Sequence, residues 1–368
     1  MIFSVRQIIV QVFCTIIFTT CTMSQVVYKD IYDAKIQYSK NSSSEVIKRM
    51  ARGKNAYNYI NIGYFLNANN IMFKKTGDKL YLDYNMEILD IILNQDRAGD
   101  SDEGWKIQVA SSNQNASSNN KESVNFEGYF FRYLGEFLHI IKSERLYNAR
   151  QQSIELYLTK SFNKWRKLSE KSFKDMSTLY HQRIHIAANW AVVSLYLYEL
   201  TKEEIYKEFY GAFDKQLRKN LVIKKKNGKA CYVWNSTYSE KFTVALRKRE
   251  TSTPIIQDVS HGNHVINYVV TAHKFHPDIW TEDDLKIFSN TLIELIWDDH
   301  SKTFSDNVDG TDSKNKEVRN TGWKQADGWM KLMTYSPQLV NLYRHYYTKN
   351  SSKISRTSFE LQYLANLK

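Results

Sequence analysis

The chain has 368 residues, a net charge of +12, 25 Tyr and 8 Trp, and 3 Cys. Cys14 and Cys21 fall in the first 24 residues, so Cys231 stands alone in the rest and an internal disulfide there is excluded. A chain of this length can bury a core large enough to fold without one. A positive surface attracts polyanions, and aromatic faces suit sugar rings, so we expect an anionic polysaccharide or oligosaccharide as the partner.

Residues 1–24 have the layout of a secretory signal. Arg6 is the single basic residue, an apolar stretch follows over 8–18, and short residues lead to Ser24. That apolar stretch is too short for a comfortable membrane span, and the pattern is typical of a cleaved signal. We therefore expect a secreted or periplasmic protein whose mature part covers residues 25–368, with lipidation at Cys21 as the alternative. Export argues against nucleic acid as the partner.

Pairs of helices repeat along the chain in the sequence pattern. The 3 prolines all lie at or after Pro254, so helices before it can run long. Apolar spacing and turn residues predict the following helices in chain order. They are residues 58–75 and 81–93, 126–141 and 146–168, 176–200 and 205–217, 261–273 and 285–297, and a last unit over 323–347.

Within each pair the first helix is apolar nearly all round and the second is amphipathic. An inner ring of buried helices inside an outer ring of half-exposed ones produces this alternation. The sequence therefore predicts an all-α fold, an (α/α) toroid of about five to seven helical hairpins in a single domain over 25–368. Residues 220–253 are expected to form a long loop or a small β-hairpin insertion. A helical bundle without a ring is the alternative.

Polar clusters stand at or near the start of four expected inner helices. They are 125–129, 180–185 with Asn189, 257–264 and 319–324. Because the amino ends of inner helices face one central cleft in a toroid, we expect these side chains to meet there. The predicted substrate-binding residues are Glu127, Tyr129, His181, His185, Asn263, His264, Trp323 and Lys324.

Three short motifs carry a resemblance to a known family. The Asn-Phe-Glu-Gly-Tyr run at 125–129, the Tyr-Val-Trp-Asn segment at 232–235 and the Asp-Val-Ser-His turn at 258–261, in this order of hairpins, resemble bacterial helical-toroid polysaccharide lyases. The similarity is to the alginate and glucuronan lyase group and covers most of the mature chain. It implies an enzyme that cleaves a uronic-acid-containing polysaccharide by β-elimination. We expect no cofactor.

The resemblance implies a catalytic set of Asn, His, Tyr and often Arg. Asn189 and His261 best match the first two, and Arg319 is the match for the arginine. The family's tyrosine has no evident counterpart, and Tyr268 is assigned by composition alone. Amide and guanidinium donors would neutralise the uronate carboxylate, while the histidine and tyrosine would act as base and acid.

Two other functions remain open at this stage. A glycoside hydrolase would need paired carboxylates, such as Glu127 with Asp258 or Asp327. A non-catalytic glycan-binding protein could use the same scaffold. His181 and His185 have a spacing that could bind zinc, but no glutamate follows His181 as in zinc proteases, so we expect no metal. We expect a monomer.

Overall fold

The computed structural model of the chain describes residues 27–37, 42–96, 104–108, 119–248 and 255–368. The expected signal at 1–24 lies outside these ranges. Within them, no helix combines the length and apolar character needed to cross a bilayer.

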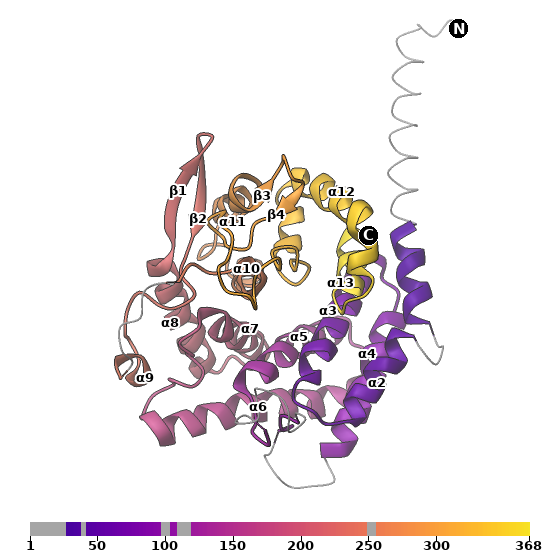
Figure 1. Ribbon diagram of the computed structural model, residues 1–368. Coiled ribbons are helices and arrows are strands. Elements are labelled where there is room, and N and C mark those ends of the chain that lie inside the picture. The colour runs from indigo at the N-terminus through magenta and orange to yellow at the C-terminus, as the bar shows by residue number, and fades with distance from the viewer. Residues whose placement is uncertain (1–26, 38–41, 97–103, 109–118, 249–254) are drawn as a thin grey trace, which may run out of the picture.

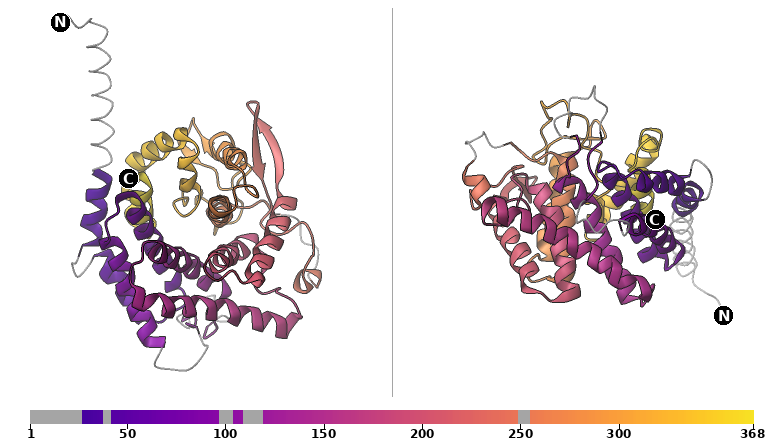
Figure 2. Two further views of the ribbon diagram at one scale, coloured as in Figure 1. Left: turned by 180° about the vertical axis from the view of Figure 1, so that it is seen from behind. Right: turned by 90° about the horizontal axis from the view of Figure 1, so that it is seen from below.

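An inner ring of helices surrounds one axis (Figures 1 and 2). Its members are α3 (Asn58–Thr76), α5 (Val124–Ser143), α7 (Ile184–Thr201), α10 (Val259–Phe275), the 3₁₀ helix η3 (Trp329–Thr334) and α13 (Glu360–Leu367). Each packs against the next in this order, and α13 packs against α3. The contact between α13 and α3 closes the ring, and the expected helical toroid is confirmed.

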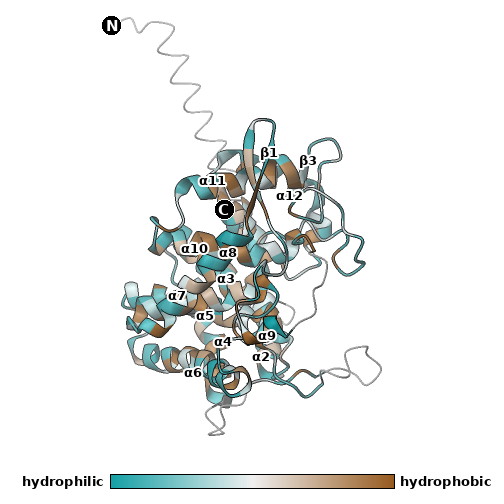
Figure 3. Cartoon of the chain, turned by 90° about the vertical axis from the view of Figure 1, so that its left-hand side faces the viewer, coloured by the Kyte–Doolittle hydropathy of each residue, from teal (hydrophilic) through white to brown (hydrophobic). Residues whose placement is uncertain are grey.

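An outer layer of helices covers the ring. It contains α4 (Leu80–Asp96), α6 (Asn148–Phe173), α8 (Glu204–Asn220), α11 (Glu282–Asn290) and α12 (Pro337–Ile354), which pack on α3, α5, α7, α10 and η3 respectively. A further helix, α2 (Ser43–Arg52), packs on α3 and α4. Residues 27–36 are also helical. Hydrophilic residues are prominent on outer helices such as α6 and α8 (Figure 3).

Burial separates the two layers as the sequence pattern predicts. In α7 every residue from Ile184 to Leu197 is buried. In α6 the buried residues recur every third or fourth position, as at Ile154, Leu158, Phe162 and Trp165. A helix enclosed on all sides must be apolar all round, whereas a helix with one face in water needs only a stripe.

Polar side chains fix where the inner helices begin. Ser123 accepts a hydrogen bond from the backbone N–H of Phe126 at the start of α5. Asp258 accepts one from the N–H of His261 at the start of α10. Each bond satisfies an amide that has no partner within its helix. The same caps hold the amino ends of α5 and α10 in place, where several of the predicted site residues lie.

The region after α8 contains the expected β-hairpin. Strands β1 (Val222–Lys226) and β2 (Lys229–Val233) pair antiparallel, with Val222 opposite Val233. The two-residue turn between them is Asn227-Gly228, and both residues have positive φ, as type I′ turns require. A short helix, α9 (Val244–Arg247), follows.

Two predicted boundaries are wrong in the second half of the ring. The helix expected over 285–297 ends earlier, since α11 passes into a π-helix, η2 (Thr291–Ile296), and Trp297 begins strand β3 (Trp297–Asp298), paired with β4 (Thr303–Phe304). The helix expected over 176–200 begins late, at Ile184, because 174–183 form turns.

The last unit also differs from its prediction. Its inner helix is the short η3, and the ring is completed by α13, which the sequence pattern did not suggest.

Candidate active site at the amino end of the inner helices

Seven side chains at the amino end of the ring contact one another in a continuous series. We call this set the amino-end cluster; it consists of Tyr129, Arg132, His185, Asp258, His261, His264 and Asp327. They come from α5, α7, α10 and the segment before η3. The sequence separates them by up to 198 positions, and the closed ring brings them together.

Asp258 and His261 form the partly exposed side of the cluster. Both carboxylate oxygens of Asp258 lie 2.9 Å from Nδ1 of His261, and the hydroxyl of Ser260 donates to Oδ1 at 2.6 Å. Burial raises the pKa of Asp258, but hydrogen bonds from His261 and Ser260 outweigh it and hold the pKa well below its usual range. The carboxylate is therefore ionised and fixes the Nδ1 proton, which leaves Nε2 of His261 for proton transfer.

His185 lies beside this pair and is buried. Its ring centroid is 4.3 Å from that of His261, and its Nδ1 atom has no hydrogen-bond partner among the described residues. Burial, and then the neighbouring His261, lower the pKa of His185 well below its usual value. A neutral imidazole with an open nitrogen thus stands next to a histidine paired with a carboxylate. Such contrasting environments are typical of an acid and base pair.

His264 links the histidines to a buried ion pair. Nη1 of Arg132 donates to its Nδ1 at 2.7 Å, and Nη2 of Arg132 lies 2.5 Å from Oδ2 of Asp327. Burial and the Arg132 charge lower the pKa of His264 well below its usual value, so the ring is neutral. Since Nδ1 accepts, Nε2 carries the proton and donates to the hydroxyl of Tyr129 at 2.9 Å. The hydroxyl hydrogen of Tyr129 is then available to another acceptor.

Several buried polar atoms near the amino ends lack partners within the described residues. They are both amide atoms of Asn189, the Oε1 atom of Gln257 and the Oδ1 atom of Asn125. Asn189 lies one turn after His185 on α7 and faces Gly128 of α5, where an added Cβ would come 3.0 Å from the Asn189 Cβ. Buried polar groups without partners are rare in native proteins. They indicate a position where a ligand or water would complete the bonding.

Lys324 adds a positive charge close to Asp258. Burial lowers the pKa of Lys324, and the Asp258 carboxylate opposes that shift. The lysine is half-buried and comes from the segment before η3.

Two of the sequence-predicted residues point away from the axis, which corrects their expected place in the site. The hydroxyl of Tyr268 donates to Asp214 at 2.6 Å and ties α10 to α8. Glu127 accepts hydrogen bonds from Lys164 at 2.6 Å and Trp165 at 2.7 Å and ties α5 to α6. Both side chains join the inner layer to the outer one, so neither shares a space with His261.

Four others are also separated from the cluster. Asn263 accepts from the backbone of Gly328 at 2.9 Å and clamps α10 to the chain before η3. Trp323 is buried against Phe359 at a centroid distance of 5.8 Å. Arg319 is exposed on the same segment, and no contact joins its side chain to the cluster in the described structure.

His181 is the fourth predicted residue that lies apart from the cluster. It is half-buried before α7, and its Nδ1 atom accepts a hydrogen bond from the backbone N–H of Arg183 at 3.1 Å. In the part of the chain that the structure describes, no three His, Cys, Asp or Glu side chains are arranged to hold a metal ion.

The arginine of the amino-end cluster is Arg132, which sequence reasoning missed. It is fully buried within the Tyr129 to Glu136 stretch of α5, among Phe130, Phe131 and Tyr133. Charged residues are almost never buried without a partner. An arginine flanked by the apolar residues Phe130, Phe131 and Leu134 on an inner helix was therefore the signal that could have found it.

No protein-family model matches the sequence, and no curated protein matches it. Solved structures similar to the chain include the GH76A α-1,6-mannanase from Salegentibacter sp. HEL1_6, at a TM-score of 0.47 and 11% identity over 88% of this chain and 97% of that one. An inactive variant of that enzyme in complex with α-1,6-mannotriose gives 0.47 and 12% over the same shares. Another, in complex with α-1,6-mannotetrose, gives 0.46 and 11% over 89% and 98%.

This comparison corrects the expected activity. The matching structures are mannanases, which are glycoside hydrolases, and not lyases. The expectation of a polysaccharide lyase, with alginate or glucuronan as its substrate, finds no support in this comparison and is not carried further. At this identity the likeness concerns the helical toroid alone.

Proposed function

We propose that the chain is a glycoside hydrolase acting on an oligosaccharide or polysaccharide at the amino-end cluster. The observation that carries this proposal is the Asp258–His261 pair, with both carboxylate oxygens 2.9 Å from Nδ1, beside the neutral His185. Three features make the pair suitable for proton transfer: the carboxylate is ionised, the His261 side chain is 31% exposed, and its Nε2 is not used by Asp258.

Hydrolysis adds one water molecule across the bond between the anomeric carbon and the glycosidic oxygen. In the proposed reaction the protonated His261 gives the Nε2 proton to the leaving oxygen, and the Asp258 carboxylate stabilises the imidazolium before transfer. His185 takes the proton of the attacking water, so the charge passes from one histidine to the other. The hydroxyl of Tyr129, oriented by His264, donates a hydrogen bond to the sugar.

The geometry favours histidines over a pair of carboxylates as the groups that exchange protons with the substrate. Glu127 is bound to Lys164 and Trp165 on the outer layer. Asp327 is bound to Arg132 and to the hydroxyl of Tyr133. Neither carboxylate is free to exchange a proton with a substrate.

The charge of the chain supports an anionic glycan as the substrate. The net charge is +12, and Lys324 lies near Asp258 at the amino end. An amine there would bind a carboxylate or sulfate on the sugar next to the cleaved bond. A secreted or periplasmic location, expected from residues 1–24, would place the protein where such glycans occur.

The test is release of reducing ends from a panel of glycans. The panel contains hyaluronan, heparin-type chains and, as a neutral member, α-1,6-mannan. We expect release from an acidic member and a loss of about 10²–10⁴-fold on His261→Ala, the range for a positioned acid or base. His345→Ala, an exposed histidine on α12, is the matched control and should keep full activity. The proposal would be contradicted if no glycan of the panel released reducing ends, or if His261→Ala and His345→Ala were equally active.

A second candidate is a protein that binds a glycan at the same place without cleaving it. It is favoured by the occupation of both cluster carboxylates, since Asp258 is held by His261 and Ser260, and Asp327 by Arg132. Binding of a panel member without release of reducing ends, lost on Lys324→Gln, would support this candidate over the hydrolase.

A further inference from the structure

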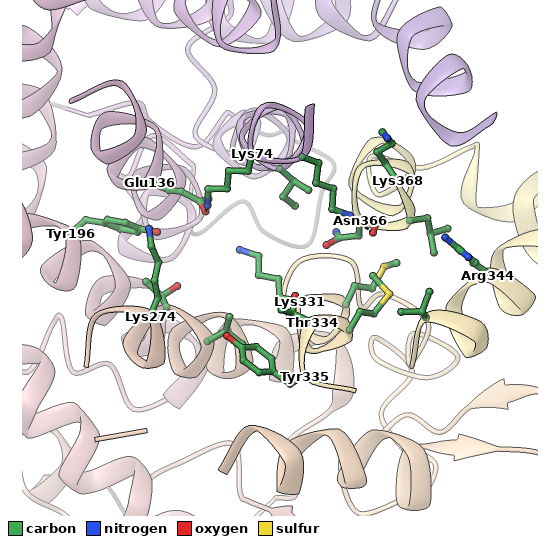
Figure 4. Close-up of a pocket in the computed structure, with 18 residues that line it drawn as sticks. Lys74, Glu136, Tyr196, Lys274, Lys331, Thr334, Tyr335, Arg344, Asn366 and Lys368 are labelled. Atoms are coloured by element: carbon green, nitrogen blue, oxygen red, sulfur yellow. Dashed lines mark hydrogen bonds and ion pairs between the residues drawn. The ribbon is translucent and has the colours of Figure 1, made fainter. Parts of the chain in front are cut away.

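A second site lies at the opposite end of the ring, where the inner helices finish. A pocket with a volume of about 470 Å³ opens there, and we call it the carboxyl-end pocket (Figure 4). Helix α10 reaches both sites, since Asp258 caps its first turn and Lys274 belongs to its last. The volume is in the range of small-molecule sites.

The carboxyl-end pocket is strongly basic. Of the described residues that line it, one has an acidic side chain, Glu136, and six have basic ones. The six are Lys74, Lys75, Lys274, Lys331, Arg344 and Lys368. They come from α3, α10, η3, α12 and the end of α13, so their charges converge from around the ring.

Internal contacts engage only part of this charge. Glu136 pairs with Lys74 at 2.5 Å. Lys331 donates to the side-chain oxygen of Asn267 at 2.5 Å, and Figure 4 shows it extending toward the space between Lys74, Glu136 and Lys274. One carboxylate side chain cannot neutralise six basic side chains, so the side chains give the pocket a positive excess.

Helix electrostatics explain why some of these basic residues lie at the carboxyl end of the ring. Cations near the last turn of a helix interact favourably with its free carbonyl groups, and Lys75 donates to the backbone oxygen of Asn366 at 2.5 Å. That role does not account for Arg344, because its buried Nε atom has no partner among the described residues. It also does not account for the crowding of like charges. Burial, then Lys368 and Arg344, lower the pKa of Lys75 to about 8.

The charged form of Lys331 is destabilised in the same way as that of Lys75. Burial lowers its pKa to about 8 even though Glu136 opposes the shift. A bound anion would reverse both effects by pairing with the ammonium groups. The pocket also offers the rings of Tyr196 and Tyr335 and the hydroxyl of Thr334, which suit a hydroxylated ring better than a bare ion.

We propose that the carboxyl-end pocket binds a small saccharide that carries sulfate or phosphate groups. Its negative groups would lie between Lys274, Lys331 and Arg344, and its ring would lie against the tyrosines. Charge-assisted hydrogen bonds from lysine and arginine to oxyanions are the strong ones. This site is separate from the amino-end cluster, and the proposal holds whether or not the chain hydrolyses glycans.

Isothermal titration with three probes tests the proposal: inorganic sulfate, inorganic phosphate and a sulfated heparin-type disaccharide. Chloride keeps the ionic strength constant, because exposed charges are screened by salt. The variant Lys274→Gln/Arg344→Gln should weaken disaccharide binding by at least about tenfold. The control Lys225→Gln/Lys226→Gln removes the same charge from the exposed hairpin and should leave the affinity unchanged. Lys274 is exposed, so the single variant Lys274→Gln replaces the double variant in the titration if the latter folds poorly.

Two further readouts distinguish binding in the carboxyl-end pocket from binding elsewhere on the chain. Binding should take up protons near pH 8.5, because an anion stabilises the charged forms of Lys75 and Lys331, and affinity should fall as the pH rises above about 8. Disaccharide binding that Lys324→Gln weakens and the pocket variant leaves unchanged would belong to the amino end and would overturn the proposal. No binding of any probe, or equal loss in the pocket and hairpin variants, would overturn the proposal. Stronger binding of phosphate than sulfate would identify phosphorylated sugars as the ligands.

Discussion

The two ends of the inner ring hold charge in opposite ways. At the amino end, each ionised group of the cluster has a partner: Asp258 with His261, and Asp327 with Arg132. At the carboxyl end, six basic side chains of the described structure line one pocket with a single carboxylate, Glu136. The first arrangement is suited to moving protons between fixed groups. The second is suited to binding a charge supplied from outside.

Part of this contrast follows from helix electrostatics alone. Acidic groups are favoured at helix amino ends and basic groups at carboxyl ends, and α10 has Asp258 at one end and Lys274 at the other. The features that helix electrostatics do not explain lie where we propose the two sites. At the amino end this feature is the buried His185, whose Nδ1 atom has no hydrogen-bond partner among the described residues. At the carboxyl end it is a set of lysines whose pKa values are lowered by burial.

The largest effect is expected from breaking the buried ion pair at the amino end. Asp327→Asn leaves Arg132 charged and buried, with a side-chain exposure of 0%. Removing one partner of such a pair costs about 3–5 kcal/mol of the free energy of unfolding. Urea denaturation measures it, with Glu170→Gln as the control, because the exposed Arg166–Glu170 pair should contribute about 0.5 kcal/mol. A loss below about 1 kcal/mol in Asp327→Asn would show that the amino end is not held by paired charge.

The next effect concerns the carboxyl end and depends on pH. Burial raises the pKa of Glu136, but Lys74 and Lys331 outweigh it and lower the pKa to about 2. A carboxyl with a lowered folded-state pKa stabilises the protein above its unfolded pKa and loses that contribution as the pH falls. Glu136→Gln should therefore cost about 2–3 kcal/mol at pH 7. The difference from the wild type should shrink between about pH 5 and pH 2.

Denaturant titrations at several pH values check this expectation. Glu155→Gln, which removes the half-exposed partner of Lys142, is the control and should cost much less at every pH. A difference for Glu136→Gln that does not change with pH would mean that the lysines do not act on this carboxyl.

The smallest effect tests the orientation of Tyr129. If His264 donates to its hydroxyl, the hydroxyl hydrogen is free for the sugar, and Tyr129→Phe should lower kcat about tenfold with a smaller change in KM. Tyr64→Phe is the control, since that ring packs against Tyr129 at 5.9 Å. Equal rates for the two variants would remove Tyr129 from the site.

The sequence predicted the layers of the fold well because burial leaves a direct pattern in it. The stripe Ile154, Leu158, Phe162 and Trp165 marks an outer helix, and the apolar run of α7 marks an inner one. It predicted the ends less well. Nothing local shows that Leu292 continues as a π-helix and not an α-helix. The place of α13 between η3 and α3 depends on contacts between segments far apart in the sequence.

The candidate site was predicted in part, because some of its residues lie close together in the sequence. Asp258 and His261 are neighbours in sequence, so their pairing could be anticipated from the helix cap. The rotation of a helix about its axis could not be anticipated. Tyr268 and Glu127 lie on inner helices as expected, yet they face the outer layer, because Asp214 and Lys164 stand there as partners.

The measurement that tests the central claim most directly is the mass of the products. The wild-type chain and His261→Ala are incubated with each glycan of the panel, and the fragments are weighed by mass spectrometry. We expect the two fragments from an acidic glycan to total the mass of the starting chain plus one water, and we expect them to be nearly absent with His261→Ala. Fragments that total the starting mass without water, or no fragments from any glycan, would contradict the assignment of the amino-end cluster as a hydrolytic site.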